Sequence, residues 1–164
     1  MTQTTTRPPA RLVWQARLMN AVNVPMRVIL GLPFTTPLSS QLMLLYLTGR
    51  KTGKSYVQPV SFVEDGQTML TPGGGRWKLN LRDGECVRAR LRGREVRLRP
   101  ELVKDAAEVD RLLRLMASKN SRITSFAPVA GPDGQIDRQR VDNAVRFGFA
   151  IVRWHFDCPP IKLS

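Results

Sequence analysis

The fold is decided by residues 42–81, LMLLYLTGRKTGKSYVQPVSFVEDGQTMLTPGGGRWKLNL. Residues 42–47 form a short, almost continuous apolar run, which is typical of a buried strand. Residues 55–63 form a second run, rich in aromatic and branched side chains. The segment EDGQ at 64–67 predicts a hairpin turn, and residues 68–70 begin the returning strand. The sequence therefore predicts neighbouring antiparallel strands in one sheet.

Two glycine-rich loops interrupt these strands. The first is the turn GRKTGK at 49–54, which carries two glycines and three cations. The second is PGGG at 72–75, where backbone N–H groups can approach a ligand closely because glycine has no side chain. Cations and free N–H groups are the usual partners of phosphate and carboxylate oxygens. We therefore expect this edge of the sheet to hold a phosphorylated or otherwise anionic cofactor.

The first loop looks like the phosphate-binding loop of a nucleotide triphosphatase, but it fails two requirements. Three residues rather than four separate Gly49 from Gly53. The residues that follow, 56–63, continue as a strand where that motif needs a helix. A nucleotide triphosphatase is therefore not expected.

Taken in order, these motifs resemble the deazaflavin-dependent nitroreductase family. The resemblance covers residues 42–98 and is carried by LTGRKTG (47–53), Pro59-Val60, Asp65-Gly66, Gly74-Gly75 and WKLNL (77–81). It implies an α+β fold, namely a split β-barrel of the FMN-binding, PNPOx-like type with about six mainly antiparallel strands and flanking helices. It also implies coenzyme F420, a deazaflavin with a phosphate and an oligoglutamate tail. The implied reaction is hydride transfer from reduced F420 to a quinone, an enone or a nitro compound.

The resemblance places the cofactor on both glycine-rich loops. Arg50, Lys51 and Lys54 are expected to meet phosphate or carboxylate oxygens, with arginine able to form two parallel hydrogen bonds. Trp77 is either a core anchor or part of the wall beside the cofactor ring. Asn80 is expected to brace its loop through its amide. The other expected cofactor-binding residues are Gly49, Thr52, Gly53, Pro59, Thr71, Gly73, Gly74 and Gly75.

No catalytic side chain is predicted, because the cofactor carries the redox chemistry and the protein fixes distance and excludes side reactions. Three features depart from the family pattern. Tyr56 stands where the family usually has an arginine, so one phosphate cation is missing. The loop from Gly75 to Trp77 is several residues shorter. Tyr46 and Tyr56 are the only tyrosines and both lie on predicted strands, so no phenol is evident as a proton donor.

Net charge leaves other hypotheses open. The 164 residues carry a formal charge of +13, which indicates acidic partners such as an anionic cofactor, a membrane surface or nucleic acid. An FMN-binding split-barrel reductase is one alternative. A non-catalytic binder of anionic lipid or nucleic acid is another, acting through the arginine-rich hairpin at 87–99. Nucleic acid is not favoured, because no known binding motif is present. A small-molecule acceptor and a homodimer are the expected partners.

Cysteine and histidine usage limits the chemistry. Cys86 and Cys158 are interpreted as reduced thiols of a cytoplasmic protein, although a single bridge stays open. His155 is the only histidine and has no metal-binding spacing, so no metal site is predicted. No apolar run reaches the roughly 18 to 20 residues that cross a bilayer. A peripheral contact with the inner membrane face stays open through the basic, amphipathic segment 10–30.

The rest of the chain predicts one domain over residues 10–158, after a disordered leader (1–9) and before a short tail (159–164). Within the domain we expect a helix over 10–30, a loop over 31–40 and a hairpin over 87–99. A capping box at Asp105 and Glu108 predicts a helix to Ser118. Residues 119–140 are expected to form a surface excursion, and residues 145–156 a final strand.

Overall fold

The computed structural model describes residues 41–82, 84–126 and 129–159. The predicted leader, first helix and following loop (1–40) lie outside these residues, as does the tail from 160. In chain order, the elements are β1 (Leu42–Thr48), β2 (Ser55–Ser61), β3 (Val63–Asp65), β4 (Thr68–Pro72), the short 3-10 helix η1 (Trp77–Asn80), β5 (Val87–Leu91), β6 (Arg94–Val103), α2 (Ala106–Lys119), the 3-10 helix η2 (Ser121–Phe126), α3 (Arg138–Arg146) and β7 (Ile151–His155).

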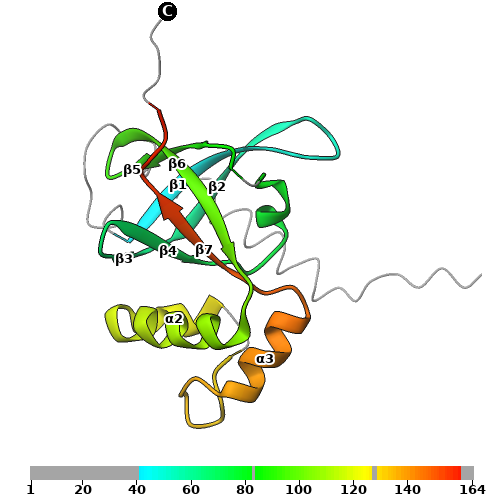
Figure 1. Ribbon diagram of the computed structural model, residues 1–164, viewed down its shortest axis with the longest axis vertical. Coiled ribbons are helices and arrows are strands. Elements are labelled where there is room, and N and C mark those ends of the chain that lie inside the picture. Colours follow the sequence, from blue (N-terminus) through cyan, green and yellow to red (C-terminus); the bar gives the residue numbers. More distant parts are fainter. Residues whose placement is uncertain (1–40, 83, 127–128, 160–164) are drawn as a thin grey trace, which may run out of the picture.

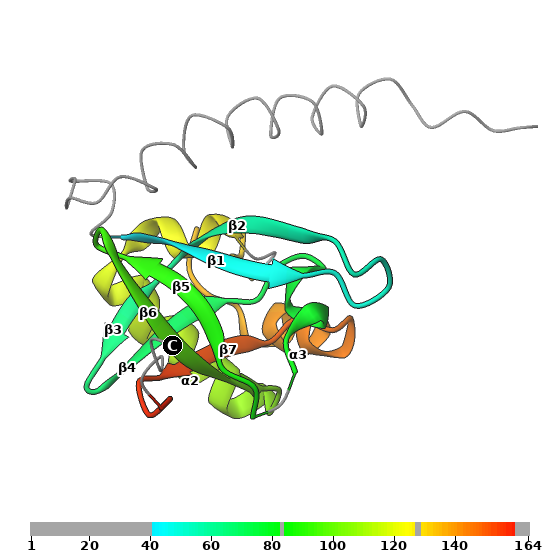
Figure 2. The same cartoon turned by 90° about the horizontal axis from the view of Figure 1, so that it is seen from above.

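The strands form a curled antiparallel sheet in the order β2-β1-β5-β6-β7-β4-β3. The first half of β6 pairs with β5 and the second half pairs with β7, so β6 joins the two parts of the sheet. The edge strands β2 and β3 follow one another in the chain, and β2 contacts β4. Figures 1 and 2 show the strands curling around a common interior, with α2 and α3 on one side. The predicted α+β split β-barrel is confirmed.

Side chains on the strands supply two apolar cores, because successive residues of a strand point to opposite faces. Met69 and Val152 lie inside the barrel, whereas their chain neighbours Leu70 and Ile151 pack in the core formed with the helices. The strands β4 and β7 are therefore buried on both faces. This explains why their sequences are apolar without a clear alternation.

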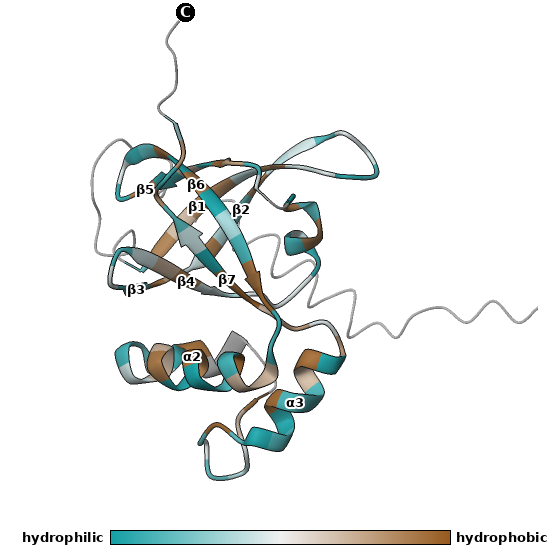
Figure 3. Cartoon of the chain, viewed as in Figure 1, coloured by the Kyte–Doolittle hydropathy of each residue, from teal (hydrophilic) through white to brown (hydrophobic). Residues whose placement is uncertain are grey.

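Helix α2 forms where the sequence predicts it. Asp105 is the N-cap, and its carboxylate accepts a hydrogen bond from the N–H of Glu108 at 2.9 Å. The Glu108 carboxylate contacts Arg111 and Arg153 rather than completing the capping box. Figure 3 shows hydrophobic and hydrophilic residues alternating along α2, as expected for a helix with one buried face. No helix within the described ranges is long and apolar enough to cross a membrane.

Two predicted strands are corrected by the structure. The predicted strand 55–63 divides at Phe62, whose N–H donates to the carbonyl of Gln41, so the chain leaves β1 and pairs with β4 instead. This division gives seven strands rather than about six. The predicted final strand 145–156 is also too long, because α3 extends to Arg146 and the strand begins at Ile151. The excursion at 119–140 contains η2 and the start of α3, neither of which was predicted.

The arginine-rich hairpin forms as predicted, with Ala89 and Leu98 fully buried on its inner face. Several of its arginines contact other parts of the chain. Arg92 lies 2.8 Å from Glu64, and Arg99 lies 2.6 Å from Asp157. The guanidinium of Arg88 lies 4.3 Å from the centroid of the Tyr46 ring and 3.6 Å from Glu95. The hairpin is therefore held to its neighbours by ion pairs and a cation–π contact.

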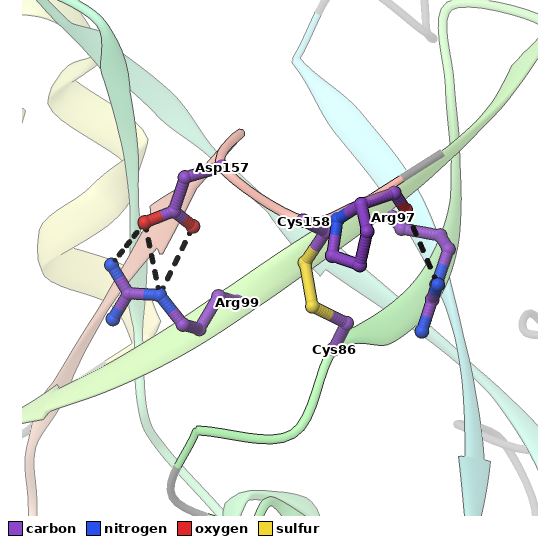
Figure 4. The surroundings of a disulfide bond; sticks show 6 residues. Cys86, Arg97, Arg99, Asp157 and Cys158 are labelled. Atoms are coloured by element: carbon purple, nitrogen blue, oxygen red, sulfur yellow. Dashed lines mark hydrogen bonds and ion pairs between the residues drawn. A yellow bond between two sulfur atoms is a disulfide. The ribbon is translucent and has the colours of Figure 1, made fainter. Parts of the chain in front are cut away.

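Cys86 and Cys158 form a disulfide across 72 residues, so their interpretation as reduced thiols is wrong. The topology explains the pairing: β5, β6 and β7 are adjacent in the sheet, so the segment before β5 meets the segment after β7. Figure 4 shows the bridge between the ion pair of Arg99 with Asp157 and the hydrogen bond from Arg97 to the Pro159 carbonyl, 3.2 Å long. These contacts fasten the segment after β7 to the outer surface of β6.

Candidate functional site

The two glycine-rich loops lie at one end of the barrel. In both Figure 1 and Figure 2, the tip of the turn between β1 and β2, the short helix η1 and the helix α3 are found at this end. The turn contains Gly49 to Lys54, and η1 directly follows the loop of Gly73 to Gly75. The structure thus brings together the two loops that the sequence assigned to one site.

A cleft of about 680 Å³ opens between the second glycine-rich loop and α3. This volume is in the range of small-molecule sites. Apolar side chains form much of its wall, and its three cations are Arg76 and Lys78 at η1 and Arg140 on α3. No aspartate or glutamate is found among the described residues that line it: Gly73, Gly74, Gly75, Arg76, Lys78, Leu79, Arg140, Asn143, Ala144, Phe147, Gly148 and Phe149. The cleft therefore suits a ligand that combines an apolar ring with negative charge.

Lys78 holds the glycine-rich loop in place. Its Nζ donates hydrogen bonds to the carbonyls of Gly73 at 2.7 Å and of Gly75 at 2.9 Å. Burial lowers the pKa of Lys78, because the charged ammonium loses contact with water. Lys78 was not predicted as a site residue, since nothing in the sequence shows that it turns back onto its own loop. The N–H groups of Gly74 and Gly75 have no hydrogen bond to any described residue.

Gly73 is required by packing. Its N–H donates to the carbonyl of Ala150 at 2.8 Å, and a Cβ on Gly73 would lie 2.3 Å from that oxygen. The close approach fastens the loop to the residue that precedes β7. Gly75 has a positive φ of 82°, which other residues rarely adopt. The glycines thus determine the shape of the loop as well as leaving room beside it.

The far wall of the cleft depends on how α3 ends. Gly148 adopts a positive φ of 92°, and its N–H donates to Val145 while the N–H of Phe149 donates to Ala144. These two bonds are the Schellman ending of a helix, in which a left-handed glycine reverses the chain. The reversal sends the two phenylalanines of the Phe-Gly-Phe segment to different environments. Phe149 is 8% exposed in the core, whereas Phe147 is 92% exposed at the cleft.

Asn80 links the two loops. Its Oδ1 accepts a hydrogen bond of 2.8 Å from the backbone N–H of Arg50, and its Nδ2 donates to the hydroxyl of Tyr56 at 2.5 Å. The prediction that Asn80 braces its loop through its amide is confirmed. The turn itself is exposed, and within the described ranges no ion pair engages Arg50, Lys51 or Lys54. These three cations are therefore available to a ligand.

Three other predicted site residues have structural contacts. Thr71 is 1% exposed, and its hydroxyl accepts a hydrogen bond of 3.0 Å from the indole of Trp154. Trp77 stacks on Trp154 with ring centroids 6.5 Å apart, as expected of a core anchor. Pro59 lies on the edge strand β2 opposite Leu44. Proline is tolerated there because the outer side of an edge strand has no neighbouring strand to which a backbone N–H must donate. None of the three lines the cleft.

Sequence reasoning missed the contribution of α3, which supplies Arg140, Asn143 and Phe147 to the cleft. The sequence nevertheless contains features that predict this helix. Asp137 is an N-cap whose carboxylate accepts from the N–H of Arg140 at 3.0 Å. The apolar residues at 141, 144 and 145 then follow at helical spacing.

His155 lies at the opposite end of β7 from Ile151, where its Nε2 is 2.6 Å from Glu101.

The comparison with known proteins agrees with this architecture. The profile of the family described as F420H(2)-dependent quinone reductase matches residues 20–130. Curated proteins gave no match. Among solved structures, one described as a domain-swapped dimer is 13% identical, covers 84% of this chain and 98% of its own, and has a TM-score of 0.50.

Two further structures are similar at lower TM-scores. An F420-H2 dependent reductase, FDR-A, is 11% identical over 70% of this chain and 94% of its own, with a TM-score of 0.47. A candidate pyridoxamine 5'-phosphate oxidase from Listeria innocua is 15% identical over 76% and 90%, with a TM-score of 0.46. The family assignment depends on the profile, which spans more than half of the 164 residues. This chain belongs to the F420H(2)-dependent quinone reductase family and is a reductase whose cofactor is reduced F420.

Proposed function

We propose that the cleft between the Gly73 to Gly75 loop and α3 is where reduced F420 meets an electron-poor acceptor. The observation that carries this proposal is the lining of the cleft: apolar walls, three cations and no carboxylate among its described residues. Supporting it, Asn80 couples the wall of the cleft to a second set of exposed cations on the turn between β1 and β2. A cofactor with a flat ring and a long anionic side chain needs both regions.

The residues present fit F420. The unengaged N–H groups of Gly74 and Gly75 are suited to oxygen atoms of the ring or of the chain attached to it. Arg50, Lys51 and Lys54 would hold the phosphate and the glutamate carboxylates, because their charges are not neutralised by ion pairs within the described ranges. The same turn could hold the single phosphate of FMN, but it offers more positive charge than one phosphate requires.

Reduced F420, when bound, supplies the hydride. The protein contributes position and environment. Lys78 keeps the glycine-rich loop in one conformation through two carbonyls, and Ala150 fixes the same loop from the other side. Once the ligands fill the cleft, its apolar walls would keep water away from the reacting groups, which would protect the hydride from side reactions. Arg76 and Arg140 border the same cleft, where positive charge stabilises the negative charge that develops on a reduced acceptor.

The acceptor is proposed to be a quinone, with enones and nitro compounds as further substrates of the same electron-poor class. Phe147 and Leu79 are 92% and 49% exposed, and both border the cleft. Exposed aromatic and aliphatic side chains at the mouth of a cleft favour a flat, apolar acceptor over a charged one.

A fluorescence titration with oxidised F420, run beside FMN at two salt concentrations, tests the cofactor. The expected result is saturable, micromolar or tighter binding of F420 and weaker binding of FMN. Binding should weaken at the higher salt concentration, because the contacts are charged. Failure to bind either cofactor would overturn the proposal.

The acceptor wall is tested by Phe147→Ser. Because Phe147 is almost fully exposed, the variant should fold with unchanged stability. We expect the KM for a quinone to rise about tenfold, since roughly 1.5 kcal/mol of apolar contact is lost, while F420 affinity is unchanged. The matched control is Phe156→Ser, which removes another exposed phenylalanine, 50% exposed and outside the lining of the cleft. Equal effects of the two substitutions would contradict the assignment of Phe147.

A homodimer belongs to the same proposal, because a groove shared by two subunits is what the family resemblance implies. The open, partly apolar cleft is compatible with a second subunit at its mouth. Light scattering after size-exclusion chromatography would measure the mass, and a monomer that retains full activity would contradict a shared site.

A further inference from the structure

The hydrogen bonds around Asn80 determine which way the hydroxyl of Tyr56 is used. The backbone N–H of Arg50 can only donate, so the Asn80 atom that it contacts at 2.8 Å must be the carbonyl oxygen Oδ1. The other end of the amide, Nδ2, therefore faces Tyr56 at 2.5 Å. An amide NH₂ group is a donor, so the Tyr56 hydroxyl acts as the acceptor in this bond.

The consequence is an unused donor. A hydroxyl carries one hydrogen as well as its lone pairs, and the contact with Asn80 uses a lone pair. No described residue accepts a hydrogen bond from the Tyr56 hydroxyl. The side chain itself is held firmly: Tyr56 lies opposite Leu47 on the core face of β2 and packs against the core inside the barrel. Its hydroxyl is therefore fixed at the junction of the two glycine-rich loops.

The charge at this junction indicates the kind of ligand. The Asn80 amide connects the Tyr56 hydroxyl directly to the backbone of Arg50, which begins the cationic part of the turn. Lys51 and Lys54 belong to the same turn, and both are exposed. A neutral O–H donor linked through Asn80 to a turn with three cations is suited to an anionic oxygen, because hydrogen bonds to charged acceptors are stronger than neutral ones.

The geometry points to Tyr56 as an anion-binding residue that donates its hydroxyl hydrogen to a phosphate or carboxylate oxygen of the cofactor's side chain. This inference rests on the proposed function, because it assumes that F420 extends from the cleft to the turn. It assigns a ligand contact to a position where the sequence comparison found only a missing arginine. The role is in binding rather than in catalysis.

The test is a fluorescence titration of full-length protein with two ligands: F420, and the deazaflavin core that lacks the phosphate and the glutamate tail. Tyr56→Phe removes the hydroxyl and keeps the ring in the core. We expect F420 affinity to fall about tenfold, the effect of one charge-assisted hydrogen bond, while affinity for the core is unchanged. The melting temperature of each variant is measured in parallel.

The matched control is Tyr46→Phe. Tyr46 is the neighbour of Leu47 on β1, so its side chain points to the opposite face, where its ring lies under Arg88. This substitution should leave both affinities unchanged. Tyr56→Arg provides a rescue: a cation at this position should restore F420 binding even though the bond from Asn80 is lost. Rescue by arginine is expected of an anion contact and is not expected of a structural brace.

Several results would overturn the inference while leaving the proposed function intact. One is an equal loss of affinity for both ligands in Tyr56→Phe, which would mean that the hydroxyl acts through the position of Asn80. Others are an unchanged F420 affinity in Tyr56→Phe, or no recovery in Tyr56→Arg. If wild-type protein binds neither ligand, the proposed function fails and this inference fails with it.

Discussion

Two basic regions of the molecule use their positive charge in different ways. The hairpin of β5 and β6 carries most of its arginines in contacts with the rest of the chain, including Arg92 with Glu64 and Arg99 with Asp157. In the turn between β1 and β2, by contrast, Arg50, Lys51 and Lys54 have no ion pair within the described ranges. Charge density alone therefore does not identify a binding surface. Cations without internal partners are the ones available to a ligand.

This difference also separates the hypotheses that net charge left open. A binder of lipid or nucleic acid through the hairpin would have to compete with the hairpin's own ion pairs. A cofactor at the turn meets no such competition among the described residues. Removing cations from the turn should therefore change the affinity for F420, whereas removing arginines from the hairpin should change the stability of the fold.

The largest effect is expected at the turn. Arg50→Ala combined with Lys51→Ala should weaken F420 binding by about 2 to 4 kcal/mol, if each residue makes a charge-assisted bond to the cofactor. The melting temperature should stay the same, because both side chains are exposed. Fluorescence titration measures the affinity.

The matched control for this variant is Arg88→Ala combined with Arg92→Ala, which removes the same charge from the hairpin. It should leave F420 affinity intact and reduce stability by no more than about 1 kcal/mol per pair, as for other exposed ion pairs. The comparison fails if the two double variants lose affinity equally.

The second effect concerns the disulfide on the hairpin side. Cys86→Ser combined with Cys158→Ser should lower the free energy of unfolding by about 3 kcal/mol, the typical effect of a disulfide, because the bridge restricts the unfolded chain across 72 residues. Urea denaturation measures this change, and wild-type protein with a reductant should give a similar value. F420 affinity measured under native conditions should not change, since the bridge lies outside the lining of the cleft. A parallel loss of affinity would show that the two regions are coupled.

The smallest effect is expected from the carboxylate of Glu108, which contacts Arg111 on the same helix and Arg153 on β7. The hydrogen bond from Arg111, with further contributions from that residue and Arg153, lowers the pKa of Glu108 from 4.5 to about 2. A carboxylate whose pKa is lower in the folded state stabilises the fold above its unfolded pKa. That contribution is lost as the pH falls from about 4.5 to about 2.

Glu108→Gln should therefore reduce the slope of stability against pH in this window, as measured by urea denaturation at a series of pH values. Glu95→Gln is the matched control, because its pair with Arg88 is exposed and 3.6 Å long. An unchanged slope in Glu108→Gln would contradict the assigned origin of the effect.

Local pattern was sufficient for much of the architecture. The apolar run of β1, the hairpin of β5 and β6, and the capped helix α2 all appear where their periodicity and turn residues predict them. Patterns failed where the chain changed partner or direction. Phe62 moves the chain from β1 to the hairpin with β4, and Gly148 ends a helix inside what looked like one strand. Neither the change of strand partner nor the end of the helix is marked by a change in the spacing of apolar residues.

The features of the candidate site can also be separated into those that local sequence predicts and those that it does not. The two glycine-rich loops and the bracing role of Asn80 were predicted from residue type and spacing. The wall supplied by α3, the inward turn of Lys78 and the bond between Asn80 and Tyr56 were not, because each depends on residues that are distant in the chain or on a reversal of direction. Thr71 was predicted to bind the cofactor because it precedes the glycine-rich loop, but its side chain is buried in the barrel.

The amino-acid sequence was sufficient to predict β1, the hairpin of β5 and β6, the two glycine-rich loops and the family resemblance, because these depend on local side-chain preferences and on motif order. Tertiary structure alone decided which cations are neutralised, that Cys86 and Cys158 form a bridge, and that α3 faces the glycine-rich loop. The physical reason is that ion pairs, disulfides and clefts require two surfaces to meet, and the curl of the sheet determines which surfaces do so.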